Sequence, residues 1–442
     1  MSVPKTDALP LGDTPTVWRC LAKPVSGCKG VVWEKCKDRR RVLHKLWGGM
    51  ENLDVIILGA GAAGLFAGIE AARRGRRVRV IDHAKAPGEK IRISGGGRCN
   101  FTNLNIAPDR FLSRNPRFAL SALKRYTQWD FIARMDGWGI AWDEKTLGQL
   151  FCDGPATQVV DALVADLQNA GGSLWLGCEI GAVEALKGGG FQVETARGLL
   201  RCASLVVATG GKSIPKMGAT GFGYRLAEQF GLPLVETRPG LVPLTFAEQE
   251  LVWMKPLSGL SVEGRVRHGR TEFAEAMLFT HRGLSGPAIL QISSYWREGE
   301  SIALDVSLGR DVVGYLREAR AQSPKAALRT ALGGLVPERL ARHLETVAAP
   351  SGPLGTLSNA ALDQVAEVLR NWRLLPVGSE GYRTAEVTLG GVETDALDAR
   401  TMQARSVPGL FFVGEVVDVT GWLGGYNFQW AWSSGWAAGQ AV

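Results

Sequence analysis

Leu53-Asp54-Val55-Ile56-Ile57-Leu58-Gly59-Ala60-Gly61-Ala62-Ala63-Gly64 is the stretch of sequence that decides the fold of this chain. It predicts a buried strand that enters a glycine turn, and the turn opens a helix whose first N–H groups can hold a pyrophosphate. A second predicted strand ends in Asp82, where an acid can bind the hydroxyl pair of a ribose. The order of strand, turn, helix, strand and acid favours a dinucleotide site over a glycine turn without a ligand.

The bulk composition predicts a globular protein with two or three domains. The chain has 442 residues, of which 45% are hydrophobic and 21% are charged. Its net charge is +8, but residues 1–49 hold ten Lys or Arg and four Asp or Glu, so +6 belongs to this segment and +2 to the rest. A nearly neutral body gives no electrostatic case for binding nucleic acid. We therefore expect no nucleic-acid partner.

The first 49 residues differ from the remainder. They carry Cys20, Cys28 and Cys36 at a spacing that matches no familiar zinc pattern, so we expect no metal site. We interpret the segment as a flexible N-terminal extension or an overlong start before Met50. It lacks the features of a signal or transit peptide. The scattered cysteines suit a reducing compartment, and no membrane span is predicted, which together favour a cytoplasmic protein.

The order of patterns along the chain predicts an α/β fold with a split nucleotide-binding domain. Residues 50–235 form its first part, and residues 373–442 return to it. Between them, residues 236–310 alternate as in an inserted β domain, and residues 311–372 have helical spacing. The run over residues 218–223 resembles a second nucleotide fingerprint, but it lacks a strand–helix–strand unit, so we interpret it as a loop and helix start.

Three further glycine sites favour a flavin over a nicotinamide as the bound cofactor. In Ser94-Gly95-Gly96-Gly97-Arg98-Cys99-Asn100 the glycines let backbone lie flat against a ring or phosphate. Ala208-Thr209-Gly210-Gly211 ends a predicted strand. Glu415 follows another strand-end glycine and suits ribityl hydroxyls. The helix that starts near Gly425 can face negative charge on a reduced flavin ring.

With the run Phe279-Thr280-His281-Arg282-Gly283-Leu284-Ser285-Gly286-Pro287, these motifs resemble the BaiN/YhiN-type flavoproteins, also called aminoacetone-oxidase-family or NAD(P)/FAD-dependent oxidoreductases. The resemblance covers about residues 53–440. It implies a Rossmann-like FAD-binding domain, split in sequence by an inserted β-barrel-like domain and a helical region. It also implies non-covalent FAD, with NAD(P)H as a possible transient electron donor. The substrates of the family are poorly defined.

The candidate site residues come from these motifs. His281 is a candidate acid or base, although packing between domains is an open alternative, and Arg98 is a second catalytic candidate. Cys99 has no cysteine near it in sequence, which favours packing beside the flavin over redox chemistry. The predicted cofactor-binding residues are Gly59, Gly61, Ala62, Ala63, Gly64, Asp82, Lys90, Gly95, Gly96, Gly97, Arg98, Asn100, Thr209, Gly210, Gly211, Gly414, Glu415, Gly425, Tyr426 and Asn427.

The function predicted from these residues is that of an FAD-dependent oxidoreductase. We expect it to exchange a hydride between FAD and a small-molecule substrate. Two alternatives stay open, a flavoenzyme that acts on RNA and a non-catalytic flavin-binding redox sensor. The sequence does not distinguish an oxidase from a reductase, and it does not predict the oligomeric state.

Overall fold

The predicted strand–helix–strand unit is present in the computed structural model, which describes residues 51–348 and 352–442. The predicted extension over residues 1–49 lies outside the described residues. Parallel strands of the first domain pair in the order β7-β2-β1-β10-β20, and β9 and β8 extend the sheet antiparallel. The strands are β1 (Glu51–Leu58), β2 (Val78–Ile81), β7 (Ser173–Trp175), β8 (Ile180–Ala185), β9 (Phe191–Thr195), β10 (Gly198–Val207) and β20 (Leu410–Phe412).

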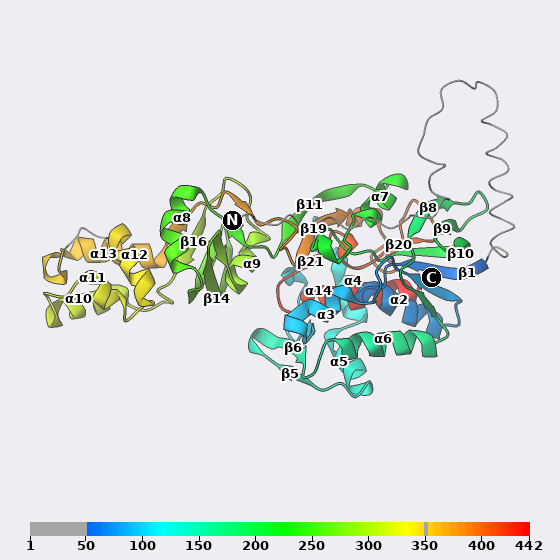
Figure 1. The fold of residues 1–442 in the computed structure, drawn as a ribbon, viewed down its shortest axis with the longest axis horizontal. Helices are drawn as coiled ribbons and strands as arrows, with labels where there is room; N and C mark the ends of the chain where they lie inside the picture. Colours follow the sequence, from blue (N-terminus) through cyan, green and yellow to red (C-terminus); the bar gives the residue numbers. More distant parts are fainter. Residues whose placement is uncertain (1–50, 349–351) are drawn as a thin grey trace, which may run out of the picture. The chain divides into compact units, whose positions relative to one another are not determined.

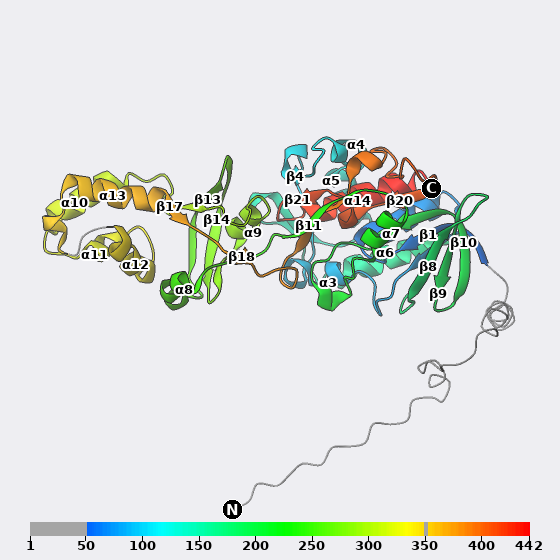
Figure 2. The same cartoon turned by 90° about the horizontal axis from the view of Figure 1, so that it is seen from above.

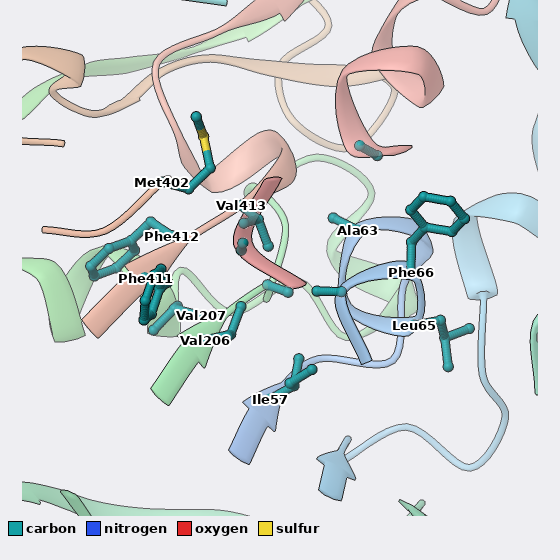
Figure 3. Close-up of a cluster of buried hydrophobic side chains, with 14 of the residues drawn as sticks. Ile57, Ala63, Leu65, Phe66, Val206, Val207, Met402, Phe411, Phe412 and Val413 are labelled. Atoms are coloured by element: carbon teal, nitrogen blue, oxygen red, sulfur yellow. The ribbon is translucent and has the colours of Figure 1, made fainter. Parts of the chain in front are cut away.

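The core of this domain lies between the sheet and two helices that are far apart in sequence. Helix α2 (Ala62–Arg73) follows β1, and α14 (Tyr426–Gly439) packs against it at the other end of the chain (Figure 1). Both helices carry small residues where they meet, since a Cβ on Gly435 would lie 2.6 Å from the Ala63 carbonyl oxygen. The side chains that fill this core come from β1, β10, β20 and α2, and include Ile57, Leu65, Phe66, Val206, Val207, Phe411 and Phe412 (Figure 3).

A second layer of short elements connects α2 to the rest of the domain. The glycine motif over residues 94–100 ends α3 (Glu89–Gly97) in a non-helical turn at Ser94, Gly95 and Gly96, and β3 (Asn100–Asn103) follows. Gly95 and Gly96 have φ of 57° and 66°, a left-handed conformation that unwinds the helix while its turn hydrogen bonds persist. Strand β3 pairs with β6 (Gln149–Cys152), and β6 pairs with β5 (Trp142–Glu144).

The remaining helices of the first domain follow the hydrophobic periodicity. Residues 118–137 form two helices, α4 (Phe118–Arg125) and α5 (Gln128–Gly137), because Thr127 starts a new helix through a capping box with Asp130. The others are α6 (Thr157–Asn169) and α7 (Phe222–Gln229).

The inserted domain has its own antiparallel sheet and its own hydrophobic core. Its strands pair in the order β17-β16-β13-β14-β15-β12-β18, and β14 packs against α9 (Pro287–Ser293). The strands are β12 (Leu244–Thr245), β13 (Ser261–His268), β14 (Thr271–Thr280), β15 (Gly283–Ser285), β16 (Ile302–Asp305), β17 (Trp372–Leu374) and β18 (Gly378–Ser379). Helix α8 (Glu248–Met254) lies between β12 and β13 along the chain. At the entry and exit of the insertion, β11 (Leu234–Gly240) pairs with β19 (Val387–Val392).

Four helices gather beyond β16 and β17 (Figures 1 and 2), namely α10 (Val312–Gln322), α11 (Leu328–Leu332), α12 (Glu338–Ala348) and α13 (Asn359–Arg370). They interrupt the inserted sheet rather than follow it, because β17 and β18 pair with β16 and β12 after the helices end. Residues 373–379 therefore belong to the inserted sheet, whereas the sequence assigned them to the returning nucleotide-binding part. Strands of two or three residues are too short to show the alternation on which that assignment relied.

No helix within residues 51–348 and 352–442 has both the length and the apolar character needed to cross a bilayer. In the same part of the chain, no group of three His, Cys, Asp or Glu side chains is arranged to hold a metal ion.

Candidate cofactor and substrate cavity

A cavity of about 840 Å³ lies at the C-terminal ends of β1, β2, β10 and β20, where an open α/β sheet usually binds its ligand. Its lining includes every predicted cofactor-binding residue except Gly64, Gly97, Arg98 and Tyr426. The residues drawn together come from the two ends of the chain and from α3, so the fold brings the separate glycine motifs to one site.

The glycine turn after β1 has a backbone shape that side chains would not allow. Gly59 has φ of 109°, and a Cβ there would lie 2.4 Å from the Ala208 carbonyl oxygen. A Cβ on Gly64 would lie 2.0 Å from the Gly59 carbonyl oxygen, so this glycine packs α2 onto the turn and does not line the cavity. A Cβ on Gly61 would meet nothing within 4 Å. The space beside Gly61 is therefore open for a ligand.

The first turn of α2 presents unsatisfied donors to this open space. The first amide of the helix with an intrahelical partner is that of Leu65, which donates to the Gly61 carbonyl. Gly61 provides no side-chain cap, and no acidic residue stands in the first turn. The N–H groups of Ala62 and Ala63 and the positive end of the helix dipole are thus available to an anion.

Two carboxylates are fixed along the cavity. Asp82 accepts hydrogen bonds from the amides of Ala60 (2.6 Å) and Ala84 (2.8 Å), which holds it beside the glycine turn. Glu415 pairs with Lys90 (Nζ–Oε2 2.5 Å) and accepts a bond from the Ser213 hydroxyl (3.0 Å). Both carboxylates are oriented by protein groups, and both can still reach hydroxyls of a bound ligand.

The opposite end of the cavity is formed by the start of α14. Gly425 is left-handed, with φ of 95°, and a Cβ there would lie 2.3 Å from the Thr102 carbonyl oxygen. The side chain of Asn427 is used by the preceding loop, since its Oδ1 accepts from the Gly421 amide (2.8 Å). The Tyr426 hydroxyl accepts a bond from Arg110 (2.5 Å), and Tyr426 stands outside the lining. Gly425 and Asn427 line the cavity at this helix start, together with Phe428, Trp430 and Ala431.

The two residues predicted to be catalytic do not line the cavity. Arg98 is held by Asp143 (2.8 Å) and Asp153 (3.3 Å), and its Nε donates to the Cys152 carbonyl (2.9 Å). Its charge therefore joins β6 to the turn before β3. His281 lies exposed in the turn between β14 and β15. We assign neither residue a catalytic role.

Cys99 has a neighbouring thiol that its sequence context did not indicate. The amide of Cys152 donates to the Cys99 carbonyl (3.4 Å), and the two thiols form a hydrogen bond that, together with burial, raises the pKa of Cys99. Both cysteines are free and buried. The lack of a cysteine close in sequence therefore did not reveal whether Cys99 has a thiol neighbour in space, because the pairing of β3 with β6 brings Cys99 and Cys152 together across 53 positions.

Glu275 is a lining residue that the sequence analysis missed. It stands on β14 in register with Phe273, Met277 and Phe279, whose side chains are buried in the core of the inserted domain. A carboxylate at an inward position of an alternating strand was the signal that could have identified it. Burial raises its pKa above the ordinary range of a glutamate.

A second recess, of about 520 Å³, lies on the inserted domain, and three arginines and one carboxylate, that of Glu367, line it. We call it the basic recess and define it by Arg267, His268, Arg370 and Arg373. The Arg267 guanidinium donates to the Arg370 carbonyl (3.0 Å). Among the described residues, none of these three arginines forms an ion pair with a carboxylate. Residues 241–380 carry equal numbers of acidic and basic side chains, so the fold, not the composition, creates this positive surface.

Comparison with known proteins identifies full-length relatives. The family model described as "HI0933-like protein Rossmann domain" matches residues 53–441. Two relatives named ribosomal RNA dihydrouridine synthase, from Escherichia coli and Haemophilus influenzae, are 50% and 44% identical over 393 residues, which is 88% of this chain and 98% of each relative. A 3-dehydro-bile acid delta(4,6)-reductase from Clostridium scindens is 27% identical over 405 residues, 87% of this chain and 98% of that protein.

Among solved structures, the similarities are more distant. A flavocytochrome c3 fumarate reductase in its open conformation has a TM-score of 0.44 at 16% identity, covering 96% of this chain and 83% of that one. A 3-ketosteroid-delta4-(5alpha)-dehydrogenase from Rhodococcus jostii RHA1 has a TM-score of 0.45 at 14% identity, covering 89% and 97%.

The named relatives contradict two predictions from the sequence. We expected a small-molecule substrate and no nucleic-acid partner, but the relatives at 50% and 44% identity are named for ribosomal RNA. The error came from averaging charge over the chain. A balanced sequence can still place three arginines together, as in the basic recess, where they outnumber the lining carboxylate of Glu367.

Proposed function

Because this chain belongs to the HI0933-like family of FAD-binding Rossmann proteins, we propose that it is a flavoenzyme that reduces uridine to dihydrouridine in ribosomal RNA. The observation that carries the proposal is the 50% identity to a ribosomal RNA dihydrouridine synthase over 98% of that relative. The same cavity-lining motifs support it, since a saturated uracil ring is the product of a hydride transfer that a flavin can supply. We also propose a cytoplasmic location, where ribosomal RNA is found.

The cavity fits FAD in the chemistry of its donors and in its open spaces. We propose that the N–H groups of Ala62 and Ala63 hold the pyrophosphate and that Asp82 binds the adenosine ribose. Glu415, oriented by Lys90, would bind ribityl hydroxyls. The start of α14 would place its positive dipole end near the flavin ring and stabilise negative charge there. When bound, FAD would supply the hydride, with NADH or NADPH as the source of electrons.

The basic recess supports the choice of an RNA substrate. Arginine recognises phosphate through a planar fork of donors, and guanidinium groups free of carboxylate partners keep those donors available. We propose that Arg267, Arg370 and Arg373 contact the RNA backbone and position it, while the base is recognised in the cavity.

The test is conversion of uridine in RNA that carries no modified nucleosides. Purified protein with FAD and either NADH or NADPH is incubated anaerobically with ribosomal RNA transcribed in vitro, and the digested nucleosides are analysed by mass spectrometry. We expect a nucleoside heavier than uridine by two hydrogen atoms, at a defined position and only when a nicotinamide donor is present.

Two controls make this result decisive. A transcript of unrelated sequence tests specificity, and protein from which FAD has been removed tests the need for the cofactor. If the flavin is reduced by the nicotinamide but no dihydrouridine forms in any ribosomal transcript or in ribosomal subunits, the proposed function is wrong.

A further inference from the structure

Glu275 is the ionisable side chain that the inserted domain contributes to the cavity. Among the described residues 244–380, Glu275 and Pro287 are the members of the cavity lining. Two other lining carboxylates are held elsewhere in the cavity. Asp82 is fixed at the glycine turn, and Glu415 is paired with Lys90. Glu275 therefore stands on the wall that the inserted domain adds to the nucleotide-binding domain.

A hydrogen-bonded glutamine holds Glu275 toward the start of α14. Gln291 on α9 is buried, with 6% of its surface exposed. Its Nε2 donates to Glu275 Oε1 (3.1 Å), and its Oε1 accepts from the amide of Leu423 (2.9 Å). Leu423 also lines the cavity and lies two residues before Gly425, where α14 begins. The carboxyl group is thus fixed from both domains at the end of the cavity proposed for the flavin ring.

Reduction of uracil needs a proton donor as well as a hydride. The C5=C6 bond of uracil is conjugated with the C4 carbonyl, so hydride arrives at C6 and the electron pair of the broken π bond develops over C5 and the C4 oxygen. A bond from C5 to a proton must then form. A positioned side chain supplies that proton more effectively than solvent does.

We propose that Glu275 is the general acid that donates this proton to C5, an inference that rests on the proposed function of this same site. In the balanced step, C6 gains a hydride from reduced flavin, C5 gains the proton of Glu275, and the C5=C6 π bond is lost. Glu275 is left as a carboxylate, and solvent protonates it again before the next turnover. The reductant is the nicotinamide that reduced the flavin.

The surroundings of Glu275 keep its proton available. Burial is the main cause of its raised pKa, and the hydrogen bond from Gln291 opposes this effect. The nearby carboxylate of Glu263 on β13 raises the pKa further. On the side of α14, Tyr426 and Arg110 form a hydrogen-bonded pair close enough for the charge of Glu275 to affect the pKa of Tyr426. A raised pKa favours the protonated form, which is the form that a general acid requires.

The test compares E275Q with the wild type and with E263Q. Glu263 carries the same charge on the neighbouring strand but lies outside the lining, so E263Q is a matched control. Anaerobic single-turnover experiments follow flavin absorbance as reduced enzyme is mixed with ribosomal RNA. We expect E275Q to slow reoxidation by RNA about 100-fold or more. FAD content, reduction by the nicotinamide and RNA affinity should match the wild type. E263Q removes only the smallest of the effects on the Glu275 pKa and leaves the Glu275 carboxyl group in place, so it should react within about threefold of the wild type.

A second variant keeps the inference testable if E275Q fails to fold. Q291L leaves the carboxyl group but removes the hydrogen bond that lowers its pKa. The Glu275 pKa should then rise, so the fall of the reoxidation rate with increasing pH should move to higher pH. A wild-type enzyme that forms no dihydrouridine would overturn both proposals. The role of Glu275 alone would be overturned by three results together. The wild type would form dihydrouridine, E275Q would be reoxidised within about threefold of the wild-type rate, and the pH dependence of reoxidation in Q291L would match that of the wild type.

Discussion

Exchange of Gly61 and Gly64 for alanine separates cofactor binding from packing within one motif. Gly61 has φ of −82°, which alanine adopts without strain, and its added Cβ would meet nothing within 4 Å. The Cβ of G64A would lie 2.0 Å from a backbone oxygen of Gly59 and 3.1 Å from the Ala208 side chain. The protein alone should therefore tolerate G61A and resist G64A.

The magnitudes follow from what each methyl group displaces. In G61A the methyl group would fill the space in which phosphate oxygens approach the Ala62 and Ala63 amides. Loss of one charge-assisted hydrogen bond costs about 1.5 to 3 kcal/mol, which weakens FAD binding about 10- to 150-fold. The apoprotein should stay within about 1 kcal/mol of the wild type. In G64A, forced movement of α2 should lower the free energy of unfolding by about 1 to 3 kcal/mol.

The assay combines FAD titration by fluorescence with urea unfolding of apoprotein. The expected pattern is weak FAD binding with normal stability for G61A, and reduced stability of the apoprotein for G64A. If G61A bound FAD like the wild type, pyrophosphate would not approach this turn and the assignment of the cavity would be wrong. Equal loss of apoprotein stability in both variants would refute the packing argument.

Three further predictions test separate parts of the molecule. Replacing all three arginines of the basic recess by glutamine should reduce the salt dependence of RNA binding, with FAD content unchanged. The slope of log affinity against log salt concentration should fall by about 2 to 3 in magnitude, and an unchanged slope would exclude the recess as a phosphate-binding surface. K90M should weaken FAD binding about tenfold, because it leaves the Glu415 carboxylate without the Lys90 ammonium group. An FAD titration curve that matched the wild type would contradict a cofactor role for this pair. Burial raises the pKa of Glu386, so its stabilising effect is complete below its unfolded pKa of about 4.3 and is lost as pH rises through the folded value. The melting temperature of E386Q relative to the wild type should therefore increase with pH, and a constant difference would contradict a raised pKa of Glu386.

Sequence patterns could predict most of the motifs that line the large cavity because each motif is local. The strand before Gly59, the turn, and the acid at position 82 lie within one strand–helix–strand unit, and backbone sterics require those residues there. The glycines near positions 210, 414 and 425 were recognisable for the same reason. No local pattern reveals which partners the side chains contact once the chain folds. Arg98 and Tyr426 stand within cofactor motifs, yet their polar groups bond to protein partners outside the lining.

The proposed substrate half of the site depends on contacts that are distant in sequence. Arg267 and Arg370 are separated by 103 positions, and only the pairing of β16 with both β13 and β17 brings them to one recess. Glu275 and Leu423 are connected through Gln291, which bonds across 132 positions to the loop before α14. Charge totals and periodicity contain no information on such pairings. This is why the fold and the flavin could be predicted, whereas a flavoenzyme that acts on RNA was only one of the alternatives that the sequence left open.

The inserted sheet explains how one domain can serve both RNA binding and chemistry. In the β13–β14 ladder, Arg267 lies opposite Glu272 and Gly264 lies opposite Glu275, so the recess and the cavity are three residues apart along the strands, about 10 Å. Because side chains alternate between faces, an odd offset places Arg267 on the outer face and Glu275 on the inner face beside α9. RNA held by the recess would thus contact the same strand pair that carries the proposed acid. The geometry of the ladder, rather than a flexible loop, would set the distance between the bound phosphates and the reacting base.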